Sequence, residues 1–131
     1  MKSVFLGGTC NESTWRNRII NMLNIDYFNP VVEDWTEECM VEELKQRENC
    51  DFCLYCITPK MIWVTSIAEV VDDSNKRPEK TILILLDSDG DDKFNEGQWK
   101  SLQNVKNMVI KNGGKYFKSL KSAANFMNKE E

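Results

Sequence analysis

The chain has no histidine among its 131 residues. Histidine is the side chain that most often gains or loses a proton near neutral pH. Any acid–base or nucleophilic chemistry must therefore fall to carboxylates, cysteine, lysine, tyrosine or a bound ligand. The missing histidine narrows the catalytic options before any motif is considered.

An excess of basic residues, a membrane-spanning run and a secretory leader are missing as well. The net charge is −4 and the isoelectric point is near 5.0, whereas proteins that bind nucleic-acid polymers usually carry a basic face. No apolar run approaches the roughly 20 residues that span a bilayer. The first residues, MKSVFLGG, continue directly into a strand-like run, so we expect no signal peptide. We therefore expect a cytoplasmic protein that binds neither a nucleic-acid polymer nor a membrane.

The composition is that of an ordinary globular domain. Hydrophobic residues make up 41% of the chain and charged residues 29%, which is typical of folded proteins and not of disordered ones. We find no internal repeat, low-complexity tract or linker that would divide the chain. We expect one domain over residues 1–131.

Five cysteines without an export signal favour reduced thiols over a disulfide framework. They are Cys10, Cys39, Cys50, Cys53 and Cys56. The last three have a C-x-x-C-x-x-C spacing, which also occurs in iron–sulfur sites. Because residues 52–58 have the pattern of a strand, Cys53 and Cys56 would point to opposite faces. Buried thiols that act as small hydrophobic residues are the favoured interpretation, and we expect no metal ion and no other cofactor.

Strand and helix patterns alternate along the whole chain. The expected strands cover residues 2–6, 26–32, 52–58, 81–86 and 115–117. The expected helices cover residues 15–23, 66–75, 98–111 and 119–127, with one more that begins after Thr36 and ends near Arg47. Asn11 or Ser13 can cap the first helix. This order predicts a single-domain α/β fold of the flavodoxin/Rossmann-like type, a parallel sheet of about five strands with helices on both faces.

In such a sheet, ligands bind beyond the carboxyl ends of the strands. The loops expected there cover residues 7–13, 29–35, 59–65 and 87–97. The first loop, GGTCNES, allows close approach of a ligand and ends at a helix N-terminus, which favours an anion, although a tight β–α turn would use the same residues. The last begins with DSDGDD, which resembles the start of a calcium loop but lacks its later ligands. We interpret it as an acidic, mobile lid.

Glu69 is the main candidate for chemistry, and it has two interpretations. The sequence Ser66-Ile67-Ala68-Glu69 fits a capping box, in which Glu69 would bond back to the amide of Ser66. However, the helix follows the central third strand, so Glu69 would also lie at the mouth of the cleft. Asp72 or Asp73 can share its helix face, and a neighbouring carboxylate would raise one pKa and suit acid–base work.

The four tryptophans divide into two groups. Trp15 and Trp99 lie on amphipathic helices and are expected in the core. Trp35 and Trp63 lie in the loops of the expected cleft, where an indole ring can stack on a base. The second pair is therefore the better choice for ligand contact.

Several segments of the chain resemble the nucleoside 2-deoxyribosyltransferase-like family. The segments are VFLGGTCNESTWR, DYFNPVVEDWT, CDFCLYCITPKM, SIAEVVDDSNKRPEKT and NGGKYFKSLKSAANFMN, which together cover nearly the whole chain. The resemblance implies an enzyme that cleaves the N-glycosidic bond of a deoxynucleoside or nucleotide and passes the sugar to another base or to water. It also implies a small-molecule nucleoside or nucleotide as partner and a homo-oligomer.

The resemblance assigns roles to particular residues. Glu69 matches the nucleophile that forms a covalent glycosyl–enzyme intermediate, which is chemistry that needs no histidine. Asp51 matches a carboxylate that positions the substrate or handles the base proton, although it could equally be a turn residue at the start of a strand. Asp72 is a possible assistant to the nucleophile. The substrate-binding candidates are Gly7, Gly8, Thr9, Asn29, Trp35, Trp63 and Ser66.

Two departures from the family pattern leave the activity open. Relatives usually carry an acid six residues before the nucleophile, where Trp63 stands in this chain. The tyrosine that some members place near the nucleophile is replaced by Gly7 or Gly8. The alternatives are therefore an N-glycosidase or deoxyribosyltransferase and a catalytically impaired protein that binds a nucleoside-derived or nucleotide-derived ligand.

Overall fold

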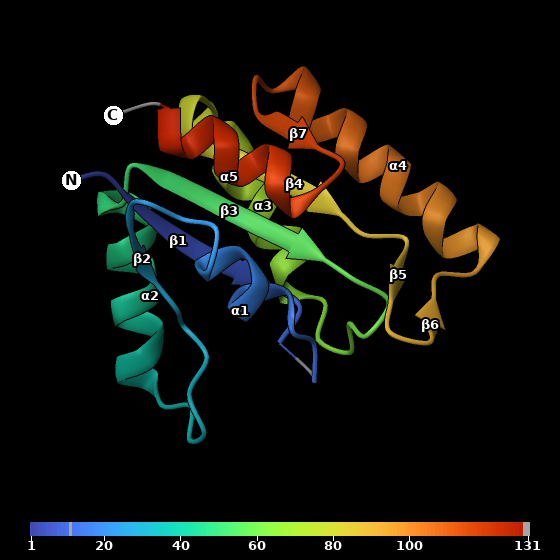
Figure 1. The fold of residues 1–131 in the computed structure, drawn as a ribbon, viewed down its shortest axis with the longest axis horizontal. Helices are drawn as coiled ribbons and strands as arrows, with labels where there is room; N and C mark the ends of the chain where they lie inside the picture. Colours follow the sequence, from blue (N-terminus) through green and yellow to red (C-terminus); the bar gives the residue numbers. More distant parts are fainter. Residues whose placement is uncertain (11, 130–131) are drawn as a thin grey trace.

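Five parallel strands form the central sheet of the computed structural model, which describes residues 1–10 and 12–129 (Figure 1). The strands are β1 (Ser3–Gly8), β2 (Asp26–Phe28), β3 (Phe52–Ile57), β4 (Thr81–Leu85) and β7 (Lys115–Phe117). Their order in the sheet is β2-β1-β3-β4-β7, and every neighbouring pair is parallel. This is the order of flavodoxin-like sheets. The predicted fold class is confirmed.

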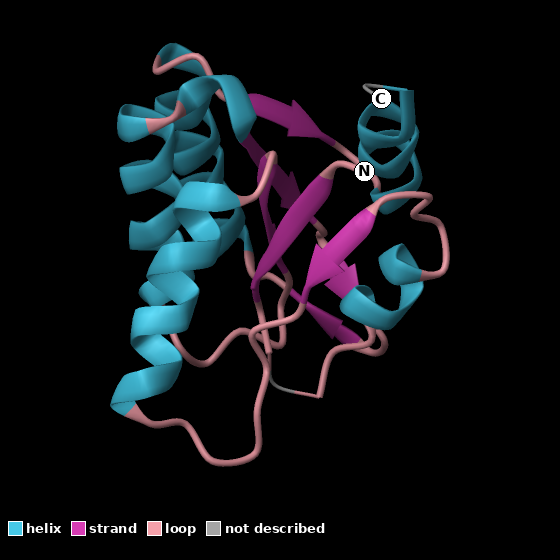
Figure 2. Cartoon of the chain, turned by 90° about the vertical axis from the view of Figure 1, so that its left-hand side faces the viewer, coloured by secondary structure: helices cyan, strands magenta, loops and turns pink. Residues whose placement is uncertain are grey.

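Helices cover both faces of the sheet, as predicted (Figure 2). They are α1 (Trp15–Ile20), α2 (Glu37–Asn49), α3 (Thr65–Lys76), α4 (Glu96–Lys111) and α5 (Leu120–Lys129), together with a short 3-10 turn, η1 (Pro78–Lys80). Helices α1 and α5 pack on one face and α3 and α4 on the other. Within the described ranges, no helix combines the length and the apolar character needed to cross a bilayer.

Alternate side chains of the central strands enter two separate hydrophobic cores. Leu54 and Cys56 of β3 pack with α1 and α5, whereas Cys53 and Tyr55 pack with α3 and α4. The prediction that Cys53 and Cys56 point to opposite faces is confirmed. Burial raises the pKa of Cys53 to about 12, so this thiol stays protonated and packs as a small hydrophobic group.

Most element boundaries lie close to the expected ones, but β1 and β2 differ for identifiable reasons. β1 continues through Gly7 and Gly8, past the expected end at residue 6. β2 ends at Phe28 and not at residue 32, because Pro30 has no N–H for a sheet ladder and the Asn29 side chain accepts a hydrogen bond from the amide of Val31 at 3.0 Å. The expected second strand is therefore reduced to its first three residues.

The start of α1 also differs from the expectation. Thr14 is the N-cap, and its side chain makes no capping hydrogen bond. Ser13, one of the two expected caps, accepts a long 3.4 Å bond from the amide of Trp15 and donates its hydroxyl proton to Asp89 at 2.6 Å. Asn11, the other expected cap, lies outside the described residues.

The acidic segment after β4 forms a small hairpin. Its strands are β5 (Ser88–Asp89) and β6 (Asp92–Lys93), which pair antiparallel around Gly90. Ser13 binds Asp89, and Lys60 binds Asp92 at 2.8 Å, so the hairpin is fastened to the loops that follow β1 and β3. These contacts join the segment to two neighbouring loops, and its movement as a lid stays a prediction.

Replacing Gly8 by alanine is expected to destabilise the fold by at least about 2 kcal/mol. Gly8 has a φ of 117°, and an added Cβ would collide with the carbonyl oxygen of Cys56 in β3. Gly97→Ala is the matched control, because the nearest atom to its Cβ is Asn95 Oδ1 at 3.5 Å, and alanine suits a helix better than glycine. Urea unfolding measures both variants. Equal free energies of unfolding for the two would contradict this account of β1.

Candidate functional site

A buried arginine binds the backbone at the end of β1 and in the loop that follows it. Arg16 of α1 donates to the carbonyl oxygens of Leu6 at 3.0 Å, Gly8 at 3.2 Å and Thr9 at 2.6 Å. Burial lowers the pKa of Arg16 to about 10, which still leaves it charged at neutral pH. The arginine therefore fixes the path of the chain at the carboxyl end of β1 and satisfies carbonyl groups that a turn would leave open.

The first three substrate-binding candidates lie at this end of β1, and all three are buried. The Thr9 hydroxyl accepts a hydrogen bond from the amide of Thr58 at 2.9 Å, which joins the ends of β1 and β3. Gly7 leaves room for the ring of Tyr55, which would lie 2.5 Å from an added Cβ. The structure thus gives Gly7, Gly8 and Thr9 roles in the backbone, and their contact with a ligand stays a prediction.

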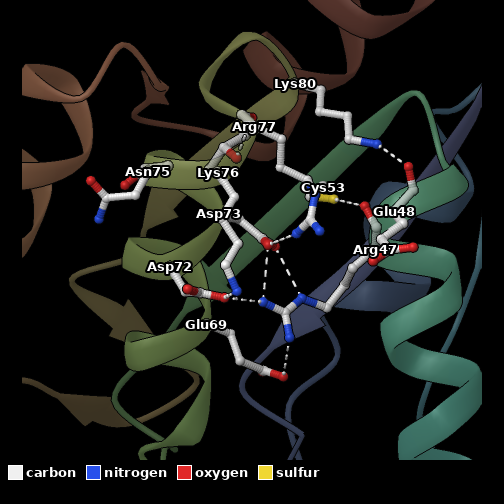
Figure 3. A network of polar contacts seen from close by, with 12 residues as sticks. Arg47, Glu48, Cys53, Glu69, Asp72, Asp73, Asn75, Lys76, Arg77 and Lys80 are labelled. Carbon is white, nitrogen blue, oxygen red and sulfur yellow. Dashed lines mark hydrogen bonds and ion pairs between the residues drawn. The ribbon is translucent and has the colours of Figure 1, made fainter.

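Glu69 lies in the second turn of α3, and its carboxylate points toward α2 (Figure 3). The N-cap of α3 is Val64, and no side chain caps the helix. The capping box expected between Ser66 and Glu69 is therefore not formed. Instead, Oε2 of Glu69 lies 3.5 Å from Nη1 of Arg47, and the Glu69 side chain is 24% exposed. Ser66 is half-buried at the start of the same helix.

Arg47 of α2 binds three carboxylates of α3. Its Nε and Nη2 donate to the two oxygens of Asp73 at 3.1 and 2.9 Å. Nη2 also donates to Asp72 at 3.2 Å, and Nη1 faces Glu69. The bidentate pair with Asp73 fixes the plane of the guanidinium group. One cation from α2 thus organises the acidic face of α3.

Asp73 is the centre of this cluster and is fully buried. Besides Arg47, it accepts hydrogen bonds from the Tyr55 hydroxyl at 2.5 Å and from Arg77. Burial and the adjacent Asp73 charge raise the pKa of Tyr55 far above its usual value, so its hydroxyl remains a donor. Two guanidinium groups and a phenol compensate the buried charge, as such a charge requires.

The charge state of Glu69 follows from its surroundings. Burial raises its pKa, the Arg47 charge lowers it, and the charges of Glu43, Asp73 and Asp72 raise it again, with a net increase over the ordinary value. Glu43 lies on α2 and accepts a hydrogen bond from Trp35 Nε1 at 3.1 Å. A partly buried carboxylate with a raised pKa is a typical candidate for a functional group.

The structure does not bring Asp51 to Glu69. Asp51 precedes β3 and accepts a hydrogen bond from the amide of Ser3 at 2.9 Å, so it lies at the amino edge of the sheet. The six residues of β3 separate that edge from the carboxyl edge by about 20 Å. A cavity of about 570 Å³ lies at the amino edge as well, lined by Asp51, Lys80 and Phe126 among others. This placement fits the alternative in which Asp51 begins a strand.

The tryptophans are distributed as their sequence contexts indicate. Trp15 is fully buried, and Trp99 of α4 is half-buried against the second core. Trp35 and Trp63 are 55% and 66% exposed in the loops after β2 and β3. Asn29 is exposed in the same loop as Trp35 and is engaged by the amide of Val31. Stacking of Trp35 and Trp63 on a base stays a prediction.

Three residues of the cluster did not emerge from the sequence as functional candidates, and one of them was considered only as a possible neighbour of Glu69. They are Arg47, Tyr55 and Asp73. Arg47 lies in the last turn of α2, where a basic residue is expected because it complements the helix dipole. This local explanation gives no sign that its side chain reaches α3. Tyr55 carried a usable signal, because a tyrosine inside a wholly buried strand needs a partner for its hydroxyl. That signal predicts a polar acceptor on the covering helix, and Asp73 is the residue found there.

Asp73→Asn is expected to lower the free energy of unfolding by about 3 kcal/mol or more, since it leaves two arginines facing a neutral amide. Asp72→Asn is the matched control on the same helix, because the Asp72 side chain is 44% exposed and exposed ion pairs contribute about 1 kcal/mol or less. Denaturant unfolding of both variants at one pH compares them. A loss for the Asp72 variant as large as for the Asp73 variant would contradict the central role of Asp73.

A comparison with known protein families identifies the family of the chain. The family model described as "Nucleoside 2-deoxyribosyltransferase like" matches residues 1–88. The matched part includes β1, β3 and α3, and with them Arg47, Glu69 and Asp73. Neither the search of curated proteins nor the search of solved structures returned a match. Because the match covers 88 of 131 residues and the whole acidic cluster, the chain belongs to the nucleoside 2-deoxyribosyltransferase-like family.

Proposed function

We propose that the protein cleaves the N-glycosidic bond of a (deoxy)nucleoside or nucleotide, with Glu69 as nucleophile and with a second base or water as acceptor. The observation that supports this most is the environment of Glu69. Its carboxylate makes no capping bond, is partly buried, and contacts the single cation Arg47. A carboxylate can trap an oxocarbenium-like centre without help from histidine.

The reaction proceeds in two displacements. In the first, a carboxylate oxygen of Glu69 bonds to the anomeric carbon while the C–N bond breaks, and the base leaves with the bonding electrons and takes up a proton. In the second, water or another base attacks the same carbon and releases a proton to solvent, and the ester bond to Glu69 breaks and restores the carboxylate. No cofactor takes part in either step.

The proton for the departing base needs an acid other than residue 63, because tryptophan has no acidic proton to donate. Asp72 is poorly suited: slight burial raises its pKa, but hydrogen bonds from Lys76 and Arg47 outweigh this and hold the pKa below its ordinary value. Asp72 therefore assists as a fixed negative charge. Glu43 on α2 is likewise a negative charge beside Glu69, so the departing base takes its proton from solvent water.

A binding protein for a nucleoside-derived or nucleotide-derived ligand is the second candidate function. Trp63 favours it, because an indole that is 66% exposed stands where relatives carry an acid. In this function Trp63 and Trp35 would stack on the base, and Glu69 would contact the sugar without attacking it. The two functions share the ligand and differ only in turnover.

Glu69→Gln is expected to lower the rate of base release by at least about 10³-fold, because it removes the nucleophile. The protein is incubated with each deoxynucleoside and deoxynucleotide, and free base is followed by chromatography. Glu79→Gln, on η1 near the amino-edge cavity, is the matched control and should keep full activity. Calorimetry measures ligand binding in parallel. No base release from any substrate, with ligand binding unchanged in the Glu69 variant, would exclude the enzyme and leave the binding protein.

The raised pKa of Glu69 also predicts how stability depends on pH. A carboxyl whose pKa is higher in the folded than in the unfolded protein stabilises the fold while protonated, and this contribution is lost as pH rises through the folded pKa. Glutamine is neutral at every pH, so Glu69→Gln should be more stable than the parent at pH 8. The difference should vanish near pH 4, and thermal unfolding at both pH values measures it. A parent that is the more stable at pH 8 would contradict this sign.

The assembly and the location of the protein stay predictions. We expect a homo-oligomer, and the exposed apolar side chains of Met40, Val41 and Leu44 on α2 are where a second copy could pack, as such patches often mark contact surfaces. Light scattering measures the number of subunits, and a monomer at all concentrations would contradict the expectation. The domain is expected to extend over residues 1–131, and the location is expected to be cytoplasmic.

A further inference from the structure

Helix α2 is joined to the rest of the protein in an unusual way. A surface helix normally buries an apolar stripe against the core. In α2, Arg47 is the only buried residue, whereas Met40, Val41 and Leu44 are 49%, 67% and 50% exposed. The helix therefore presents to α3 a guanidinium group and not an apolar face.

The guanidinium group of Arg47 is fixed before it reaches Glu69. The side chain is 7% exposed, and two of its nitrogens are bound by both oxygens of Asp73. Asp73 also accepts hydrogen bonds from Tyr55 of β3 and from Arg77, the C-cap residue of α3. The guanidinium group is planar, and two of its nitrogens bind the same carboxylate, so it cannot rotate without breaking a hydrogen bond. The direction of Nη1 is therefore determined by the bonds to Asp73.

Nη1 ends beside one oxygen of Glu69. The distance to Oε2 is 3.5 Å, which is the longest contact of the guanidinium group. Among the residues that the structure describes, Oε1 of Glu69 has no hydrogen-bond partner. The two oxygens of the carboxylate are thus unequal: one faces a fixed cation and the other is available.

We propose, on the basis of the function proposed above, that Arg47 is a positioning residue of this site, which holds Oε2 of Glu69 and leaves Oε1 as the oxygen that attacks the anomeric carbon. The cation also offsets the negative charges that face Glu69. These are Glu43 on α2 and Asp72 and Asp73 on α3. The Tyr55 hydroxyl on β3 adds no charge, because it stays protonated. In a positioned nucleophile, a displacement of about 1 Å can lower the rate by about 10²-fold.

A purely structural role for Arg47 can be separated from this one, because the chain contains a matched arginine. Arg77 also binds Oδ1 of Asp73, and its side chain is 17% exposed, against 7% for Arg47. Within the described ranges, Arg77 makes no ion pair with Glu69. Replacing either arginine therefore removes a partner of the buried carboxylate, but only the Arg47 variant changes what Glu69 contacts.

The test measures the titration of the Glu69 carboxyl group directly. Protein with ¹³C-labelled glutamate is titrated by NMR in the parent, Arg47→Met, Arg47→Lys and Arg77→Met forms, and Glu69→Gln assigns the signal. The proposal expects the pKa of Glu69 to rise in Arg47→Met and to stay at the parent value in Arg77→Met. Arg47→Lys keeps the positive charge but loses the planar guanidinium group, so the pKa of Glu69 in this variant should lie between those in the other two. If Arg47→Met does not fold, Arg47→Lys compared with Arg77→Lys gives the same answer.

Kinetics then distinguish positioning from charge alone. In Arg47→Lys, kcat for base release should fall about 10- to 100-fold with little change in KM, and the pH at half-maximal kcat/KM should move upward. An identical Glu69 titration in the Arg47 and Arg77 variants would overturn the positioning role, whatever the activity. A shifted titration in a protein that releases no base from any substrate would keep the positioning of Glu69 and exclude the proposed reaction.

Discussion

The burial of one carboxylate, Asp73, is the constraint on which the polar interior of this protein depends. A charge removed from water is tolerated only when donors replace the water, and the donors here come from three elements: Tyr55 from β3, Arg77 after α3, and Arg47 from α2. Each donor then imposes a condition of its own. The ring of Tyr55 needs a glycine at position 7, and Arg47 draws α2 toward α3 although the apolar side chains of α2 remain exposed.

This arrangement connects stability to the site. The bonds that compensate Asp73 also orient the guanidinium group that faces Glu69. The buried half of the cluster is therefore structural, and the outer half is the part to which we assign the proposed chemistry. Partial burial among Glu43, Asp72 and Asp73 makes the ionised form of Glu69 costly. Functional groups are often held in such unfavourable surroundings, and the remainder of the fold supplies the stability that they remove.

The fold was largely predictable from local patterns, whereas the site was predictable only in part. Apolar runs such as residues 52–57 and the cap at Thr36 depend on neighbours in sequence, and both were found. The bond between Arg47 and Asp73 spans 26 positions, so no local pattern contains it. The contacts of the hairpin at residues 88–93 with Ser13 and Lys60 are likewise distant in sequence. Of the two interpretations of Asp51, its bond to the amide of Ser3 fits the turn at the start of a strand, and a role in the reaction stays a prediction.

A chain without histidine can still hold a reactive group near its useful charge state, because the pKa of a carboxylate responds to burial and to neighbouring charge over a wide range. In Glu69, burial and three acidic neighbours raise the pKa, and one arginine opposes them. An arginine opposes these charges better than a lysine would, since it stays charged when buried and donates hydrogen bonds from several nitrogens at once. The balance at Glu69 thus depends on a cation that also compensates the buried charge of Asp73, so a change that displaces Arg47 alters the titration of Glu69 as well as the stability of the fold.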